Sequence, residues 1–129
     1  MLFARFVLGF YSLSFLVFGV WAVFSPTSMA RFIHYDLLDG LARAEFRAFY
    51  GGTEIALAIL LLVPFFKPQW TTAALVLLGV AGAAIGLSRL VGMIADQVGG
   101  NFLIIALVWE LSAAVLAGWA WLRLSPGQA

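Results

Sequence analysis

Residues 70–94 read WTTAALVLLGVAGAAIGLSRLVGMI, an unbroken apolar run that contains a single charged residue, Arg89. About 20 helical residues cross the roughly 30 Å hydrocarbon core of a bilayer, so this run predicts a transmembrane helix. Three runs of the same kind lie at residues 6–24, 46–66 and 102–122. Because the runs are continuous and do not alternate between apolar and polar residues, they predict helices and not barrel strands. We therefore expect an all-α, integral membrane four-helix bundle that forms one membrane domain over residues 1–129.

Composition excludes most other classes of protein. The chain has 129 residues, of which 64% are hydrophobic and 10% charged, and its mean hydropathy is +1.08. Soluble domains are nearer half apolar and a quarter charged. A net charge of +1 offers no basic face for nucleic acid. With no cysteine and one histidine, disulfides, thiolate metal sites and paired-histidine haem sites are not expected, so we predict no metal and no cofactor.

The long connection at residues 25–45 has apolar residues at helical spacing with charged residues between them. This pattern, after Ser25 and Pro26, predicts a short amphipathic helix at the membrane interface. An irregular loop with a few buried anchors is the alternative.

Charge placement also suggests an orientation. Four spans put both termini on one side of the membrane, and that side carries Arg5, Lys67 and Arg123 with no acidic residue beside them. Although the two sides have nearly equal numbers of Lys and Arg, the short, purely basic side resembles a cytoplasmic face. We expect an N-in/C-in protein.

Four ionisable residues fall inside the predicted spans. Glu54 and Glu110 each lie about 12 Å from the start of their helices, and Arg89 lies about 7 Å from the end of its helix, at 1.5 Å rise per residue. Arg47 is just inside the second span. With alternating spans, all four belong to the non-cytoplasmic half of the membrane.

Pairing would remove most of the cost of these charges, which is at least about 2.5–3.5 kcal/mol for one at mid-bilayer. In one arrangement Glu54 pairs with Arg89, and Glu110 pairs with Arg47. In the other, Glu54 pairs with Arg47, and Glu110 pairs with Arg89. Gly82 and Gly86 form a GxxxG step that allows close helix approach, so Arg89 is expected to face another helix. The cluster is either a set of structural ion pairs or a polar pocket.

The second span contains Arg47, Tyr50, Gly51, Gly52 and Glu54 in the string RAFYGGTE. Four of these residues, all but Gly52, are spaced i, i+3, i+4 and i+7 and share one face of the predicted helix. Arg89 and Asp96 follow around the end of the third span, and Glu110 lies on the fourth.

This order resembles domain-of-unknown-function family 4345, small four-span bacterial membrane proteins that are broadly similar to DoxX-like proteins. The resemblance implies a four-helix fold in a bacterial inner membrane, and it supplies no activity. By the resemblance, the matched positions are Arg47, Tyr50, Gly51, Gly52, Glu54, Arg89 and Glu110. The usual acidic-Gly turn after the third span is altered, since two residues separate Asp96 from Gly99.

Three functions are compatible with this cluster. The leading one is non-enzymatic: the cluster, with Asp96 at its edge, binds a lipid-like or other amphipathic small molecule. The second is an accessory or assembly subunit of a larger membrane complex, or a homo-oligomer. The third is an acid/base enzyme, such as an isomerase, that uses Glu54 or Glu110 on a membrane-dissolved substrate. Membrane lipids are the expected partners in all three.

Overall fold

The computed structural model describes residues 1–124, and over that range it contains helices and connecting turns but no strand. Within those residues, four helical stretches are long and apolar enough to cross a membrane: Leu2–Phe24, Gly40–Phe66, Pro68–Ala95 and Asn101–Leu122. The predicted all-α class and the four membrane spans are confirmed.

The second span begins earlier than the sequence suggested. Helix α3 (Gly40–Phe46), the π-helix η1 (Arg47–Gly52) and helix α4 (Thr53–Phe66) follow one another without a break, so the predicted linker to residue 45 was too long. Asp39 sets the new start, because its Oδ1 accepts a hydrogen bond from the backbone N–H of Ala42 at 2.7 Å. Helix α1 (Leu2–Phe24) also begins earlier than the predicted residue 6.

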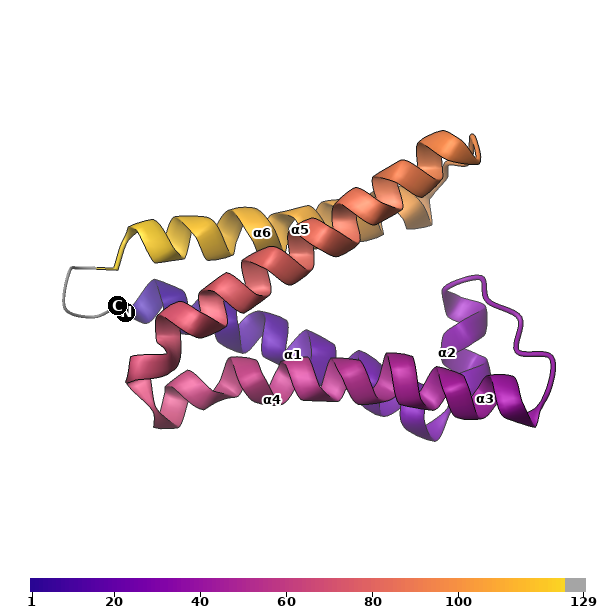
Figure 1. The fold of residues 1–129 in the computed structure, drawn as a ribbon, viewed down its shortest axis with the longest axis horizontal. Coiled ribbons are helices and arrows are strands. Elements are labelled where there is room, and N and C mark those ends of the chain that lie inside the picture. Colours follow the sequence, from indigo (N-terminus) through magenta and orange to yellow (C-terminus); the bar gives the residue numbers. More distant parts are fainter. Residues whose placement is uncertain (125–129) are drawn as a thin grey trace. The chain divides into compact units, whose positions relative to one another are not determined.

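The connection between the first two spans contains one short helix, α2 (Pro26–Phe32), which Figure 1 shows turning away from the end of α1. Pro26 occupies its first turn, as the sequence predicts, but the Ser25 side chain makes no capping hydrogen bond. The buried residues of α2 are Pro26, Met29 and Ala30, and the last two pack with Ala22 and Phe46. The helix ends just before His34, whose φ is 63°.

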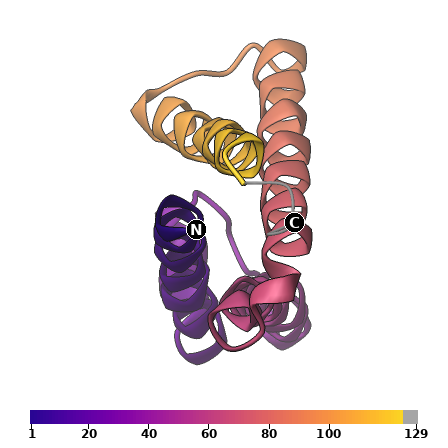
Figure 2. The ribbon, with the colours of Figure 1, turned by 90° about the vertical axis from the view of Figure 1, so that its left-hand side faces the viewer.

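The described chain divides into two compact units, Gly9–Leu62 on one hand and residues 1–8 with 63–124 on the other. In the second unit, the short helix η2 (Pro68–Trp70) leads into α5 (Thr71–Ala95), and α6 (Asn101–Leu122) returns beside it. Figures 1 and 2 both show α5 and α6 as an antiparallel hairpin. The turn between them uses left-handed backbone at Gln97 (φ 52°) and positive φ at Gly100 (φ 138°).

Glycines bring the helices of each unit close together. A Cβ atom at Gly82 of α5 would lie 2.6 Å from the carbonyl oxygen of Glu110 on α6. In the Gly9–Leu62 unit, a Cβ at Gly19 of α1 would lie 2.9 Å from the backbone nitrogen of Ile55 on α4. Distances this short leave no room for any larger residue, so backbone-to-backbone packing holds both helix pairs. Ser12 adds a hydrogen bond between the spans, since its Oγ donates to the carbonyl oxygen of Ala58 at 2.8 Å.

Candidate functional site

Arg89 on α5 and Glu110 on α6 form a two-point ion pair. Arg89 Nε donates to Glu110 Oε2 at 2.8 Å, and Nη2 of the same guanidinium binds Oε1. The side chains of Arg89 and Glu110 are 27% and 12% exposed, so most of the ion pair is buried. The two-point geometry fixes the orientation of both groups, which a lysine in place of Arg89 would not do. Of the two arrangements that the sequence leaves open, the structure contains the Arg89–Glu110 pair of the second, but it does not contain the Arg47–Glu54 pair that this arrangement also requires.

The ridge of small residues on α5 explains how the two side chains meet. Gly86 lies three residues before Arg89, and a Cβ there would be 2.8 Å from Leu111 Cδ2. The backbones themselves are close one turn earlier, at Gly82, so the long Arg89 side chain reaches the carboxylate on the next helix without crossing a wide gap. The expectation that Arg89 faces a neighbouring helix agrees with this geometry.

Arg47 has a different role from the one that the sequence suggested. Its Nε donates to the carbonyl oxygen of Val23 at 2.9 Å, in the last turn of α1. The last four carbonyls of a helix lack intrahelical partners, and a guanidinium at that end also suits the helix dipole. Although Arg47 and Glu54 belong to the same unit, the structure does not pair them. The Arg47 side chain therefore links the second span to the C-terminal end of the first by a hydrogen bond.

The motif RAFYGG of residues 47–52 forms the π-helix η1. The prediction that Arg47, Tyr50, Gly51 and Glu54 share one face used α-helical spacing, which does not apply to residues 47–52 because a π-helix has wider turns. π-Helical turns are rare and occur often at functional sites. No local pattern predicts them, so the sequence analysis missed this feature.

The two glycines of the motif differ in their surroundings. Gly51 is buried, and a Cβ there would lie 2.5 Å from Val23 Cγ2 and 3.3 Å from the carbonyl oxygen of Gly19. Gly52 is exposed, and its nearest neighbour would be the carbonyl oxygen of Arg47 at 4.0 Å. Gly51 is therefore required for packing against α1, whereas Gly52 leaves open space beside the π-helix.

Tyr50 belongs to an aromatic group that joins the connection to the second span. Its ring stacks on Phe46 with centroids 4.6 Å apart, and Tyr35 meets both rings edge-on at 5.8 and 6.3 Å. Edge-on and offset-stacked pairs are the favourable arrangements of aromatic rings. Tyr35 and Phe46 were not among the predicted site residues, because neither lies on the charged pattern that the sequence analysis followed.

Glu54 is half-buried in the first turn of α4. Its Oε2 atom is buried, and among residues 1–124 no group forms a hydrogen bond with it. Buried polar atoms almost always have a partner, so this carboxylate oxygen is an exception.

Asp96 directly follows the third span. It is exposed at the C-terminal end of α5, where its backbone N–H donates to the carbonyl oxygen of Gly92 at 2.9 Å. Within the described part of the chain, its carboxylate forms no ion pair. Over the same residues, no group of three or more His, Asp or Glu side chains could hold a metal ion.

The family model described as "Domain of unknown function (DUF4345)" matches residues 3–121 of this chain. No curated protein and no solved structure gives a match. The match covers all four spans and every position of the RAFYGGTE string, Arg89 and Glu110. This chain, a small integral membrane protein, therefore belongs to the DUF4345 family.

Proposed function

We propose that the protein binds a lipid-like or other amphipathic small molecule through the carboxylate of Glu54. The observation that supports this function is the buried Oε2 atom, which has no hydrogen-bond partner among residues 1–124. An unsatisfied buried polar group costs about 1–3 kcal/mol, and more when it is charged. A ligand that donates a hydrogen bond to Glu54 removes this cost, so binding energy is available at that atom.

The helix around Glu54 suits an approaching ligand. The π-helix η1 ends at Gly52, two residues before Glu54, and Gly52 is exposed. A ligand in this region meets one strong acceptor within an otherwise apolar span.

The acceptor determines the chemistry of the ligand. An ionised carboxylate only accepts hydrogen bonds, so the ligand must present a hydroxyl, amide or amine donor. The flanking segment IALAILLL, residues 55–62, is entirely apolar, so the rest of the ligand should be apolar as well. These two requirements describe an amphipathic molecule that dissolves in the membrane.

We assign a structural role to the Arg89–Glu110 pair. Both carboxylate oxygens of Glu110 already receive a donor from Arg89, so this carboxylate has less capacity for a ligand than Glu54 has. The pair instead fixes the register of α5 against α6, a role for which buried ion pairs are suited.

The test compares small molecules that co-purify with three forms of the protein in mild detergent. Wild type and Glu45→Gln, which changes an exposed carboxylate on α3, should retain the same amphipathic compound in organic extracts analysed by mass spectrometry. Glu54→Gln should retain much less of it, because a neutral amide oxygen is a weaker hydrogen-bond acceptor than a carboxylate. If Glu54→Gln retains every compound that wild type retains, this function is wrong.

The same purification distinguishes the assembly role. A foreign membrane subunit that co-purifies at fixed stoichiometry with wild type and with Glu54→Gln, without any bound small molecule, would favour an accessory subunit. A small molecule that depends on Glu54 favours the binding function.

We further propose an N-in/C-in orientation in a bacterial inner membrane. Support comes from the basic residues Arg5, Lys67 and Arg123, which flank the ends of the spans without any acidic neighbour. Because the second span begins at Gly40, Glu54 lies near the middle of that span in either orientation.

A further inference from the structure

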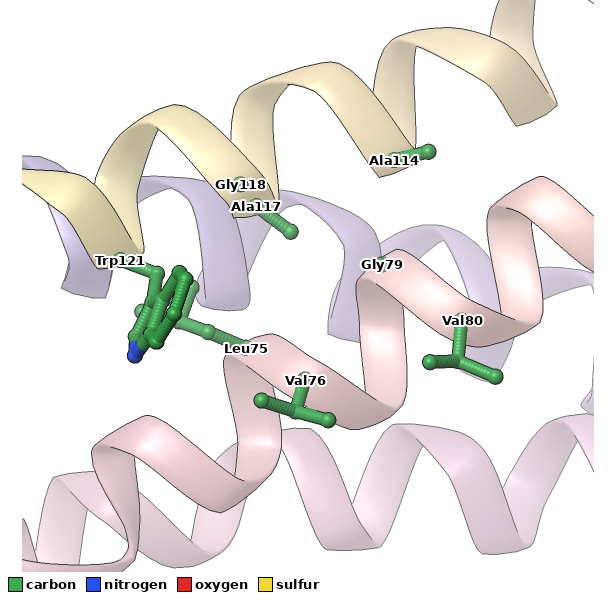
Figure 3. Close-up of a pocket in the computed structure, with 8 residues that line it drawn as sticks. All are labelled: Leu75, Val76, Gly79, Val80, Ala114, Ala117, Gly118 and Trp121. Carbon is green, nitrogen blue, oxygen red and sulfur yellow. The ribbon is translucent and has the colours of Figure 1, made fainter.

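A groove opens between α5 and α6 in the unit formed by residues 1–8 and 63–124. Its volume is about 210 Å³, and Val76, Gly79, Ala114, Gly118 and Trp121 are among the residues that line it. Figure 3 shows Trp121 at one end of the groove and Val80 with Ala114 at the other. Apart from backbone and the indole nitrogen of Trp121, the lining is hydrocarbon.

The groove begins at the end of the unit where its cations are concentrated. Trp121 lies two residues before Arg123, and the opposite wall starts close to the N-terminal end of α5. From Trp121 to Ala114 the wall on α6 rises about 10 Å into the span, at 1.5 Å per residue. The groove therefore runs in the same direction as a lipid acyl chain, which extends from a polar headgroup at the membrane surface into the hydrocarbon.

Ring contacts place Arg5 and Arg123 at that end. The Arg123 guanidinium carbon lies 4.7 Å from the centre of the Trp119 ring, and Phe3 meets the same ring edge-on at 5.3 Å. Arg5, two residues after Phe3, has its guanidinium carbon 5.8 Å from the centre of the Phe65 ring. Lys67 follows Phe65 by two residues, so three cations belong to one end of this unit.

These cations have no anionic partner within residues 1–124. No Asp or Glu occurs in residues 1–8, 63–80 or 114–124, and the buried Nε of Arg5 has no hydrogen-bond partner in the described range. A guanidinium binds phosphate oxygens in a two-point arrangement, so a phosphate group would satisfy Arg5 and neutralise the local charge. The unpaired positive charges and the unsatisfied Nε of Arg5 both favour the binding of an anion at this end of the unit.

We propose that this end of the unit binds an anionic phospholipid of the surrounding membrane, with one acyl chain in the α5–α6 groove and its phosphate at Arg5 and Arg123. An acyl chain fits the hydrocarbon lining and the course of the groove, while the phosphate supplies the anion that the arginines lack. The Trp121 indole lies between these two environments, where a ring with one polar atom is well suited. This site is separate from Glu54 and does not depend on the function proposed for that residue.

Native mass spectrometry of the delipidated full-length protein tests the proposal. The probes are phosphatidylglycerol and phosphatidylcholine that carry the same palmitoyl and oleoyl chains. Wild type should bind phosphatidylglycerol more tightly. Arg5→Gln and Arg123→Gln should each weaken that binding about fivefold, since a basic residue near an anionic headgroup contributes about 1 kcal/mol. Arg31→Gln, an exposed arginine on α2, should have no effect and controls for net charge.

A second pair of variants tests the acyl chain. A Cβ atom added at Gly118 or at Gly92 would have no heavy atom within 4 Å, so the two positions are matched in the space around the backbone. Gly118→Leu fills the groove and should weaken binding of both lipids by at least fivefold, whereas Gly92→Leu, outside the groove, should not.

Three results would overturn the proposal. One is equal affinity of wild type for the two lipids, and another is an equal loss in Arg31→Gln and Arg5→Gln. The third is a Gly118→Leu variant that keeps wild-type lipid affinity but changes oligomeric state, since the groove would then hold a helix of a second copy.

Discussion

The guanidinium of Arg89 holds both carboxylate oxygens of Glu110, and this pair joins the third span to the fourth. It lies where the two backbones are close enough that a Cβ at Gly82 would be 2.6 Å from the carbonyl oxygen of Glu110 itself. Glu110 of α6 therefore takes part in both contacts: its backbone packs against Gly82, and its carboxylate binds Arg89. Each makes the other more favourable, because close backbones shorten the reach of the arginine and the ion pair fixes the register of the glycines.

Removing either partner of this ion pair should destabilise the protein. Arg89→Gln or Glu110→Gln should each lower the free energy of unfolding by about 1.5–3 kcal/mol, since each leaves a charged hydrogen-bonding group without its partner. Reversible unfolding in mixed micelles measures the change. In the double variant Arg89→Gln/Glu110→Gln the loss should be less than the sum of the two single losses. Additive losses would show that the two side chains act independently.

Gly82 should be far more sensitive to substitution than Gly92 on the same helix. Gly82→Val places a side chain against the backbone of α6 and should lower the free energy of unfolding by about 1–3 kcal/mol, as overpacking does. In Gly92→Val the added Cβ would have no heavy atom within 4 Å, while the change in intrinsic helix propensity is the same as in Gly82→Val. Equal melting temperatures for the two variants would contradict the close approach of α5 and α6.

The neighbouring glycines of the π-helix provide a similar comparison in the other unit. Gly51→Ala should destabilise the protein by about 1–3 kcal/mol, because its Cβ would lie 2.5 Å from Val23 Cγ2. Gly52→Ala, whose Cβ would have open space, should be neutral or slightly stabilising. Thermal unfolding in detergent measures both. A more damaging change at Gly52 than at Gly51 would contradict the packing of η1 on α1.

The proposed orientation can be tested without background labelling, because the chain has no cysteine. In intact cells, Gly99→Cys, in the turn between α5 and α6, should react with a membrane-impermeant maleimide. Gln69→Cys, between the second and third spans, should react only after the cells are opened. The reverse pattern would place both termini outside the cytoplasm.

The sequence was sufficient to predict the class of fold. The thickness of the hydrocarbon core sets the length of each apolar run, and that length does not depend on how the helices pack against one another. The sequence also indicated that Arg89 faces another helix, since Gly82 and Gly86 lie on the same ridge. The start of the second span was placed too late, because the predicted boundary followed the apolar run and gave no weight to the Asp39 cap.

Other features of the site could not be predicted from the sequence. The π-helix at residues 47–52 changes the spacing of side chains around this segment, and its Gly51 packs closely against α1. The sequence analysis also expected Arg47 to pair with a carboxylate. A backbone carbonyl at the end of α1 is its partner instead, and a sequence pattern of charged residues cannot reveal such an acceptor.

The central claim is that Glu54 Oε2 depends on a partner from outside the chain. Its most direct test is the free energy of unfolding of delipidated wild type and delipidated Glu54→Met in the same detergent. Methionine has a similar length and no group that needs a hydrogen bond. The ligand-free variant should therefore be more stable than ligand-free wild type by about 1–3 kcal/mol. A less stable Glu54→Met protein would show that the carboxylate already has its partner within the chain, and would contradict the account.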